Sequence, residues 1–145
     1  MTAIVTDAHY RMSVSLIRDL SDRGVRVVAC EKASIENPVG FASGRVWRCV
    51  RLPDEAYEDA LLDLCRELSA QDGEMPALLP VGAKTLALLS ENRERFSAAA
   101  GLCIPTPSQL SLLNDKAAVA ELAGRLGVPT PESFEPAEGE ALDAF

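Results

Sequence analysis

Metal-binding and aromatic residues are scarce in this chain of 145 residues, which contains one histidine, four cysteines and 5% aromatic residues. Without a Cys-x-x-Cys pair, the usual zinc-binding patterns are absent, so we predict no metal site. Cys30, Cys49 and Cys65 lie in apolar runs, which predicts buried, reduced thiols. With so few aromatic residues, the core must consist mainly of Leu, Val, Ile and Ala, a composition suited to helices packed on a parallel sheet.

Long apolar runs and a basic surface are also missing. The first residues lack the basic and apolar regions of a signal peptide, and no apolar stretch approaches the ~20 residues of a membrane-spanning helix. The formal net charge of −8 argues against a nucleic-acid partner. The local basic stretch of Arg45, Arg48 and Arg51 is interpreted as a solvent face of a strand. We therefore expect a cytoplasmic protein with no membrane or nucleic-acid partner.

Glycine-rich nucleotide-binding turns are absent as well. A dinucleotide-binding turn needs glycines so that pyrophosphate reaches backbone N–H groups, but residues 6–11 read Thr-Asp-Ala-His-Tyr-Arg. Asp7, at a predicted strand end, is typical of phospho-accepting receiver domains, yet the strand end at 80–82 offers no second Asp. Neither a Ser/His/Asp set nor a paired-carboxylate spacing is found, so we name no catalytic residue.

Alternating strand and helix patterns indicate the fold. Short apolar runs predict strands at 3–6, 25–30, 45–52 and 77–81. Apolar residues at helical spacing predict helices at 11–23, between 53 and 73, and from 85 onward, with 90–96 continuing the last helix or forming a separate turn. A strand, a helix, a glycine and a strand make a βαβ unit. The predicted class is α/β, a Rossmann-like open parallel sheet with helices on both faces.

Ligands of such sheets collect at the C-terminal ends of the strands, which makes four residues candidates for substrate binding. His9 and Arg11 follow the first strand and suit an anionic substrate, but both also fit as solvated turn residues. Glu31 follows the second strand, where it is a substrate contact, a ribose ligand or a helix cap. Gly82 either lets the backbone approach a ligand or makes a simple turn. The residues alone indicate a ligand-binding α/β domain.

Composition changes after about residue 104. Pro105 and Pro107 break the chain, and a short helix is predicted at 108–113. Asn114-Asp115 form a plausible N-cap for a helix from 116 to about 126. Residues 139–145 have the pattern of an amphipathic helix that is only beginning. We therefore expect the chain to be a piece of a longer protein.

Two series of residues resemble the N-terminal region of ATP-grasp proteins, the superfamily of carbamoyl-phosphate synthase, biotin carboxylase and D-alanine–D-alanine ligase. The first is Leu-Leu-Pro-Val-Gly at 78–82 with Thr-Leu-Ala-Leu-Leu-Ser-Glu-Asn-Arg at 85–93. The second and more specific series is Asn-Asp-Lys at 114–116, a helix, and Gly-Val-Pro-Thr-Pro at 127–131. The resemblance implies a pre-ATP-grasp α/β domain at residues 1–113 and the start of the ATP-grasp domain at 114–145.

The resemblance also implies the chemistry of the full-length protein. Such an enzyme activates a small-molecule carboxylate as an acyl phosphate, which an amine or another nucleophile then attacks, and it uses ATP with magnesium. Lys116 matches the position from which related enzymes reach the ATP phosphates. The family's remaining catalytic parts would lie beyond Phe145, so we expect no cofactor and no turnover for this chain alone.

Alternatives remain beside the ligase interpretation. The main one is a non-catalytic small-molecule-binding or regulatory α/β module, and a Rossmann oxidoreductase is disfavoured by the missing glycines. Related chains often carry an acidic residue where Gly82, Ala83 and Lys84 stand here, which makes the substrate contacts of this loop differ. The identity of the substrate is not readable, and a homodimer is left open.

Overall fold

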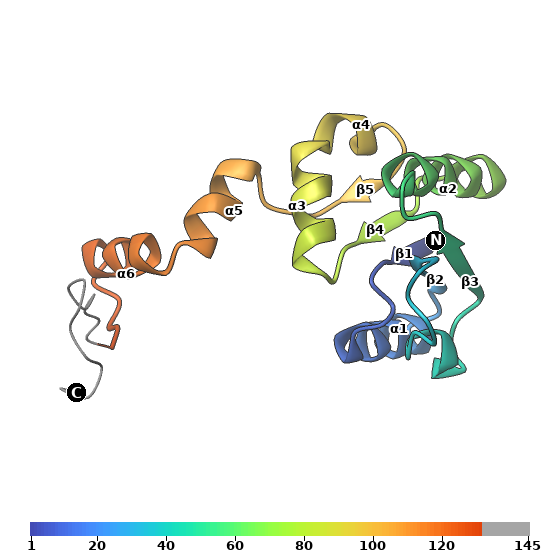
Figure 1. Ribbon diagram of the computed structural model, residues 1–145, viewed down its shortest axis with the longest axis horizontal. Coiled ribbons are helices and arrows are strands. Elements are labelled where there is room, and N and C mark those ends of the chain that lie inside the picture. The colour runs from blue at the N-terminus through green and yellow to red at the C-terminus, as the bar shows by residue number, and fades with distance from the viewer. Residues whose placement is uncertain (132–145) are drawn as a thin grey trace. The chain divides into compact units, whose positions relative to one another are not determined.

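Short apolar runs form one five-stranded sheet in the first part of the chain (Figure 1). The computed structural model describes residues 1–131. All strand pairs are parallel, in the order β3-β2-β1-β4-β5. The strands are β1 (Thr2–Val5), β2 (Arg26–Lys32), β3 (Arg48–Leu52), β4 (Ala77–Leu79) and β5 (Gly101–Leu102). The predicted α/β class with a Rossmann-like parallel sheet is confirmed.

Helices cover both faces of this sheet. They are α1 (Arg11–Asp22), α2 (Tyr57–Asp72), α3 (Ala83–Glu91) and α4 (Arg93–Ser97), with a 3₁₀ turn η1 (Phe41–Ser43). One core cluster joins Ile17 of α1 to Val5 and Val27 of the sheet. The other cluster joins helices α2, α3 and α4 to the opposite face, around Ile4 and Leu78. Figure 1 shows α1 and α2 on opposite sides of the strands.

The edge strand β3 departs from the sequence predictions. It begins at Arg48 rather than at residue 45, and Val50 is only half-buried. Cys49 is exposed, so its predicted burial is wrong, whereas Cys30 and Cys65 are buried as expected. The physical reason is that an edge strand without a helix over one face leaves alternate side chains in solvent. Burial raises the pKa of the Cys65 thiol to about 12.

Glycines end two of the helices. Gly24, with φ +77°, follows α1, and its N–H donates to the carbonyl of Ser21 at 2.9 Å. Gly73, with φ +70°, follows α2. Helix α2 begins at Tyr57 and not at residue 53. Its predicted first turn is diverted because the Asp54 carboxylate instead accepts the Ser34 N–H at 3.0 Å, which holds this segment to the β2–β3 loop.

The chain divides into two compact units, Met1–Pro107 and Ser108–Phe145. The described part of the second unit holds most of α5 (Pro107–Asn114) and all of α6 (Lys116–Arg125), and neither helix has a buried residue. Asp115 caps α6 as predicted, because its carboxylate accepts the Ala118 N–H at 3.0 Å. The helix predicted at 139–145 lies outside the described residues. The assignment of 114–145 to an ATP-grasp domain stays a prediction.

Candidate functional site

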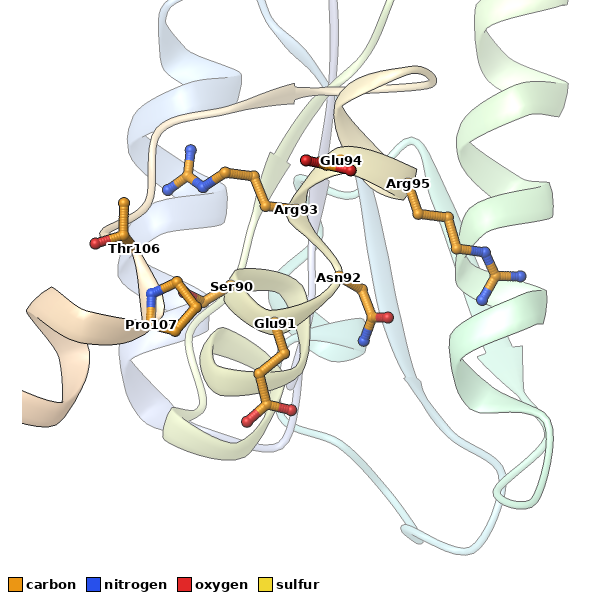
Figure 2. A pocket seen from close by; sticks show the side chains of 8 residues that line it. All are labelled: Ser90, Glu91, Asn92, Arg93, Glu94, Arg95, Thr106 and Pro107. Carbon is orange, nitrogen blue, oxygen red and sulfur yellow. The ribbon is translucent and has the colours of Figure 1, made fainter.

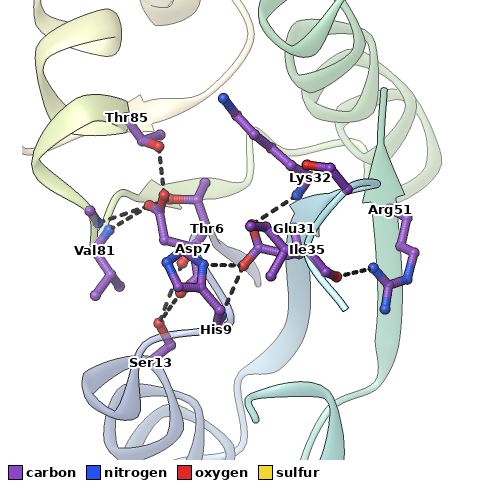
Figure 3. Close-up of polar contacts among 12 residues, drawn as sticks. Thr6, Asp7, His9, Ser13, Glu31, Lys32, Ile35, Arg51, Val81 and Thr85 are labelled. Carbon is purple, nitrogen blue, oxygen red and sulfur yellow. Dashed lines mark hydrogen bonds and ion pairs between the residues drawn. The ribbon is translucent and has the colours of Figure 1, made fainter. Parts of the chain in front are cut away.

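Three of the four predicted site residues, His9, Glu31 and Gly82, take part in two contacts at the C-terminal edge of the sheet. Figure 3 shows His9 beside Glu31, and Asp7 beside Val81 and Thr85. His9, in the turn between β1 and α1, meets Glu31 on β2. Gly82, in the turn between β4 and α3, meets Asp7 of the first turn. Arg11 is exposed at the first position of α1 and takes no part in the hydrogen bonds of either pair. Substrate binding by these residues remains a prediction.

Asp7 connects the first turn to the turn before α3. Its φ of 55° lies in the left-handed region, which Asp tolerates better than most residues. Its Oδ2 accepts the N–H groups of Gly82 at 2.8 Å and Val81 at 3.3 Å, and also the hydroxyl of Thr6. Its Oδ1 accepts the Thr85 hydroxyl at 2.7 Å. The Asp7 carboxylate is therefore saturated by donors of the protein itself.

This arrangement fills the position that an anionic ligand would take at the start of α3. Backbone N–H groups at a helix N-terminus attract anions, and here the Asp7 carboxylate accepts them. A Cβ at Gly82 would lie 2.7 Å from Asp7 Oδ1, so glycine is needed at this position to admit the carboxylate. The sequence interpretation weighed Asp7 only as a phospho-acceptor. No local pattern signals its structural role, because its partners Val81, Gly82 and Thr85 lie 74, 75 and 78 positions away.

The second pair places the chain's one histidine on a buried carboxylate. Glu31 is 2% exposed. Its Oε2 accepts the His9 backbone N–H at 2.8 Å and lies 2.6 Å from His9 Nδ1. Its Oε1 accepts the Lys32 N–H at 2.9 Å. The pair joins the ends of two adjacent strands, which periodicity alone does not bring together.

The loop after β2 closes over the first turn. The Gly40 N–H donates to the Ala8 carbonyl at 2.7 Å, and a Cβ at Gly40 would lie 2.8 Å from that oxygen. In dinucleotide-binding folds the pyrophosphate approaches this first turn. The close approach of Gly40 and the lack of turn glycines both argue against the oxidoreductase alternative.

Tyr57, the first residue of α2, is buried. Burial raises the pKa of its hydroxyl well above the ordinary range. The hydroxyl is therefore neutral at physiological pH.

Two cavities lie away from these pairs. One, of about 490 Å³, is lined by the residues from Ser90 to Arg95 with Thr106 and Pro107 (Figure 2). There Arg93 donates to the Ile104 carbonyl, while its buried Nε has no hydrogen-bond partner in the described part of the chain. The other, of about 400 Å³, lies beside Phe41 and Arg51. The candidate site is thus defined by polar groups at strand ends.

Two further features concern metal ions and membrane-spanning helices in the described residues. Within residues 1–131, no group of three or more His, Cys, Asp and Glu side chains is placed to hold a metal ion. Among the same residues, no helix has the length and apolar character needed to cross a membrane.

Comparison with known proteins finds similarity at the level of structure. No protein-family model and no curated protein sequence matches the chain. The biotin carboxylase domain of a single-chain bacterial carboxylase matches with a TM-score of 0.62 and 24% identity, over 89% of this chain and 30% of its own length. An L-amino acid ligase from Bacillus licheniformis matches with a TM-score of 0.53 and 18% identity, over 90% and 31%.

A third structure is the biotin carboxylase domain of the 2-oxoglutarate carboxylase from Hydrogenobacter thermophilus, a dimer in complex with MgADP, ADP and bicarbonate. It matches with a TM-score of 0.56 and 19% identity, over 89% of this chain and 28% of its own length. This chain thus spans under a third of the structures that it resembles. At these identities the likeness establishes the fold, and the predicted resemblance to ATP-grasp proteins is confirmed at that level.

Proposed function

We propose that this chain is the N-terminal, substrate-side part of an ATP-dependent ligase of the ATP-grasp type. The supporting observation is the match of about nine tenths of the chain to biotin carboxylase domains and to an L-amino acid ligase. The full-length enzyme activates a small-molecule carboxylate as an acyl phosphate. It then transfers the acyl group to an amine or another nucleophile, and phosphate leaves. Residues 1–113 form the pre-ATP-grasp domain, and 114–145 begin the ATP-grasp domain.

Lys116 is the residue of this chain that we assign to the ATP phosphates. It is exposed at the first position of α6, and the preceding Asp115 is engaged in capping that helix. An ammonium on a flexible stem neutralises a polyphosphate as a point charge, so the residue type and its exposure fit the role. Bound ATP with magnesium supplies the phosphoryl group. His9, Arg11, Glu31 and Gly82 are the proposed substrate-binding residues at the sheet edge.

The remaining parts of the proposal concern the whole protein. A biotin carboxylase domain with this fold forms a dimer in complex with MgADP and bicarbonate, which supports ATP and magnesium as cofactors and a homodimer as the assembly. We place the protein in the cytoplasm. The chain of 145 residues alone neither turns over substrate nor binds ATP tightly, because we match none of its residues to the acidic magnesium ligands of the family.

The test uses the protein encoded by the whole reading frame. We expect ATP-dependent phosphate release in the presence of a carboxylate and an amine. Loss of one charge-assisted contact costs roughly 1.5–3 kcal/mol, so Lys116→Ala lowers kcat/KM for ATP by at least about tenfold. The matched control Arg125→Ala removes a positive charge from the same helix and changes kcat/KM less than about twofold.

Two results would contradict the proposal: an unchanged kcat/KM in Lys116→Ala, or micromolar binding of MgATP to the 145-residue chain in calorimetry. The alternative is a non-catalytic small-molecule-binding or regulatory module. It is supported by the first unit, which contains both core clusters of the described residues. A reading frame without a lysine-bearing strand and an acidic metal-binding region downstream would favour that module.

A further inference from the structure

The carboxylate of Glu31 is buried and needs hydrogen-bond donors. Its side chain is 3% exposed, while that of His9 is 34% exposed. Three donors meet its two oxygens: the backbone N–H groups of Lys32 and His9 and the ring nitrogen Nδ1 of His9. The ammonium of Lys32 is directed elsewhere, 5.1 Å from the centre of the Tyr57 ring. His9 is therefore the side chain that satisfies Glu31.

This geometry assigns the proton of the imidazole. An ionised carboxylate only accepts hydrogen bonds, so the ring nitrogen 2.6 Å from Oε2 carries the proton. When Nδ1 of a neutral imidazole is protonated, Nε2 has the lone pair. Two donors of the same residue bind the same oxygen, which fixes both the backbone and the ring of His9.

The side chain of His9 is about one third exposed, and the ring contact with Glu31 is made through Nδ1, which leaves Nε2 as the nitrogen for a ligand. The Tyr10 ring lies beside the imidazole, with centroids 4.0 Å apart and an interplanar angle of 39°. Figure 3 shows Lys32 and Arg51 at this edge beside the carboxylates of Glu31 and Asp7. The Lys32 ammonium lies over the Tyr57 ring, and Arg51 donates to the Ile35 carbonyl. A lone pair backed by a buried carboxylate suits a ligand that donates a hydrogen bond or carries positive charge.

We propose that His9 and Glu31 form an amine-binding pair, in which Glu31 is the positioning residue and the Nε2 lone pair of His9 accepts a hydrogen bond from the ligand's ammonium or amine. The proposal rests on the proposed function, whose second substrate is an amine or another nucleophile, and assigns the amine to this end of β1 and β2. It reverses the anionic preference that the sequence suggested for His9.

The first measurement uses the unsubstituted chain. Because the chain contains one histidine, long-range ¹H–¹⁵N correlation of the ¹⁵N-labelled protein at pH 7.5 reports on His9 alone. We expect the tautomer with Nδ1 protonated. In Glu31→Leu, which leaves no acceptor beside Nδ1, we expect this tautomer to be lost, and in the exposed control Glu36→Leu we expect it to be kept. A protonated Nε2 in the unsubstituted chain, whether in the other neutral tautomer or in the imidazolium, would overturn the proposal.

The second measurement distinguishes the ligand classes. L-Alaninamide, an amine without a carboxylate, shifts the Nε2 resonance saturably, whereas N-acetyl-L-alanine, a carboxylate without an amine, does not. Glu31→Leu loses the response. A shift with N-acetyl-L-alanine, or no shift with either compound, overturns the amine site. Failure of the amine site and failure of the proposed function can be told apart. Both measurements are made without ATP, whereas the ligase test is ATP-dependent phosphate release.

Discussion

Asp7 shows how one residue shapes the edge of the sheet. Its left-handed backbone and its short carboxylate together reach two N–H groups and two hydroxyls. The position thus demands a residue that tolerates positive φ and accepts several hydrogen bonds. Aspartate meets both requirements, and asparagine meets only the first.

That difference makes Asp7→Asn an informative substitution. The amide keeps the shape and the tolerance of positive φ, but it turns an NH₂ group toward donors. Leaving one or more partly buried donors unsatisfied should lower the free energy of unfolding by roughly 1–3 kcal/mol in urea denaturation. The exposed control Asp63→Asn, whose partner is Arg66, should cost less than about 0.5 kcal/mol. Equal losses in both variants would contradict the structural role of Asp7.

At the scale of residues, the location of the candidate residues at the sheet edge could be predicted from the sequence, but their contacts could not. His9, Glu31 and Gly82 were found because they follow apolar strand runs, and parallel strands end at a common edge. The hydrogen bond between His9 and Glu31 spans 22 positions and depends on the pairing of β1 with β2. Neither strand sequence, taken alone, indicates which strand it pairs with.

At the scale of elements, a polar network joins three of them at the opposite end of the sheet. The Thr2 hydroxyl at the start of β1 donates to the Asp72 carboxylate at 2.6 Å. Arg26 at the start of β2 forms an ion pair with Asp72 at the end of α2, and its guanidinium lies 4.6 Å from the centre of the Trp47 ring. The network fixes the C-terminal end of α2 against the beginning of the sheet.

This network predicts a dependence of stability on pH. Hydrogen bonds from Arg26 and then Thr2 hold the pKa of Asp72 below its ordinary value of 3.8. A lowered pKa in the folded state stabilises the protein above the unfolded pKa, and this contribution is lost as pH falls through the folded pKa. The difference in urea midpoint between the unsubstituted chain and Asp72→Asn should therefore be full at pH 6 and shrink below about pH 4. A constant difference from pH 6 to pH 2.5 would contradict this assignment.

The elements that could not be predicted from the sequence are those without a periodic pattern of apolar residues. Gly101 and Leu102 form β5, and two residues are too few for an alternation to be seen. The early start predicted for α2 failed because the tertiary contact between Ser34 and Asp54 outweighs the favourable first-turn acids. Strand β2 was predicted because burial on both faces makes its short apolar run continuous.

At the scale of the whole molecule, the buried residues are concentrated in the first unit. Every buried residue of the described chain lies between Thr2 and Ala100. Two hydrogen bonds hold residues 104 and 105 to helices α3 and α4, and we call them the ties of this unit. The Ser90 hydroxyl donates to the Pro105 carbonyl at 2.8 Å, and Arg93 donates to the Ile104 carbonyl. The described helices of the second unit contain no buried residue.

This distribution predicts that residues 1–107 fold alone. Thermal unfolding followed by circular dichroism should be cooperative, with a Tm within about 4 °C of the full chain, which corresponds to under about 1 kcal/mol. A cut after residue 97 removes β5, the buried Ala99 and Ala100 and both ties, and should lower Tm far more. Loss of cooperative unfolding in residues 1–107 would show that the second unit is needed for the first.

The saturated carboxylate of Asp7 also decides which molecules can compete for the sheet edge. An anion from solution must displace a group that is covalently attached to the same chain, and a tethered group acts at an effective concentration on the order of millimolar or higher. Weakly bound phosphates at lower concentration are outcompeted at the N–H groups of Val81 and Gly82. The backbone N–H groups before α3 are thus occupied from within by the protein's own anion.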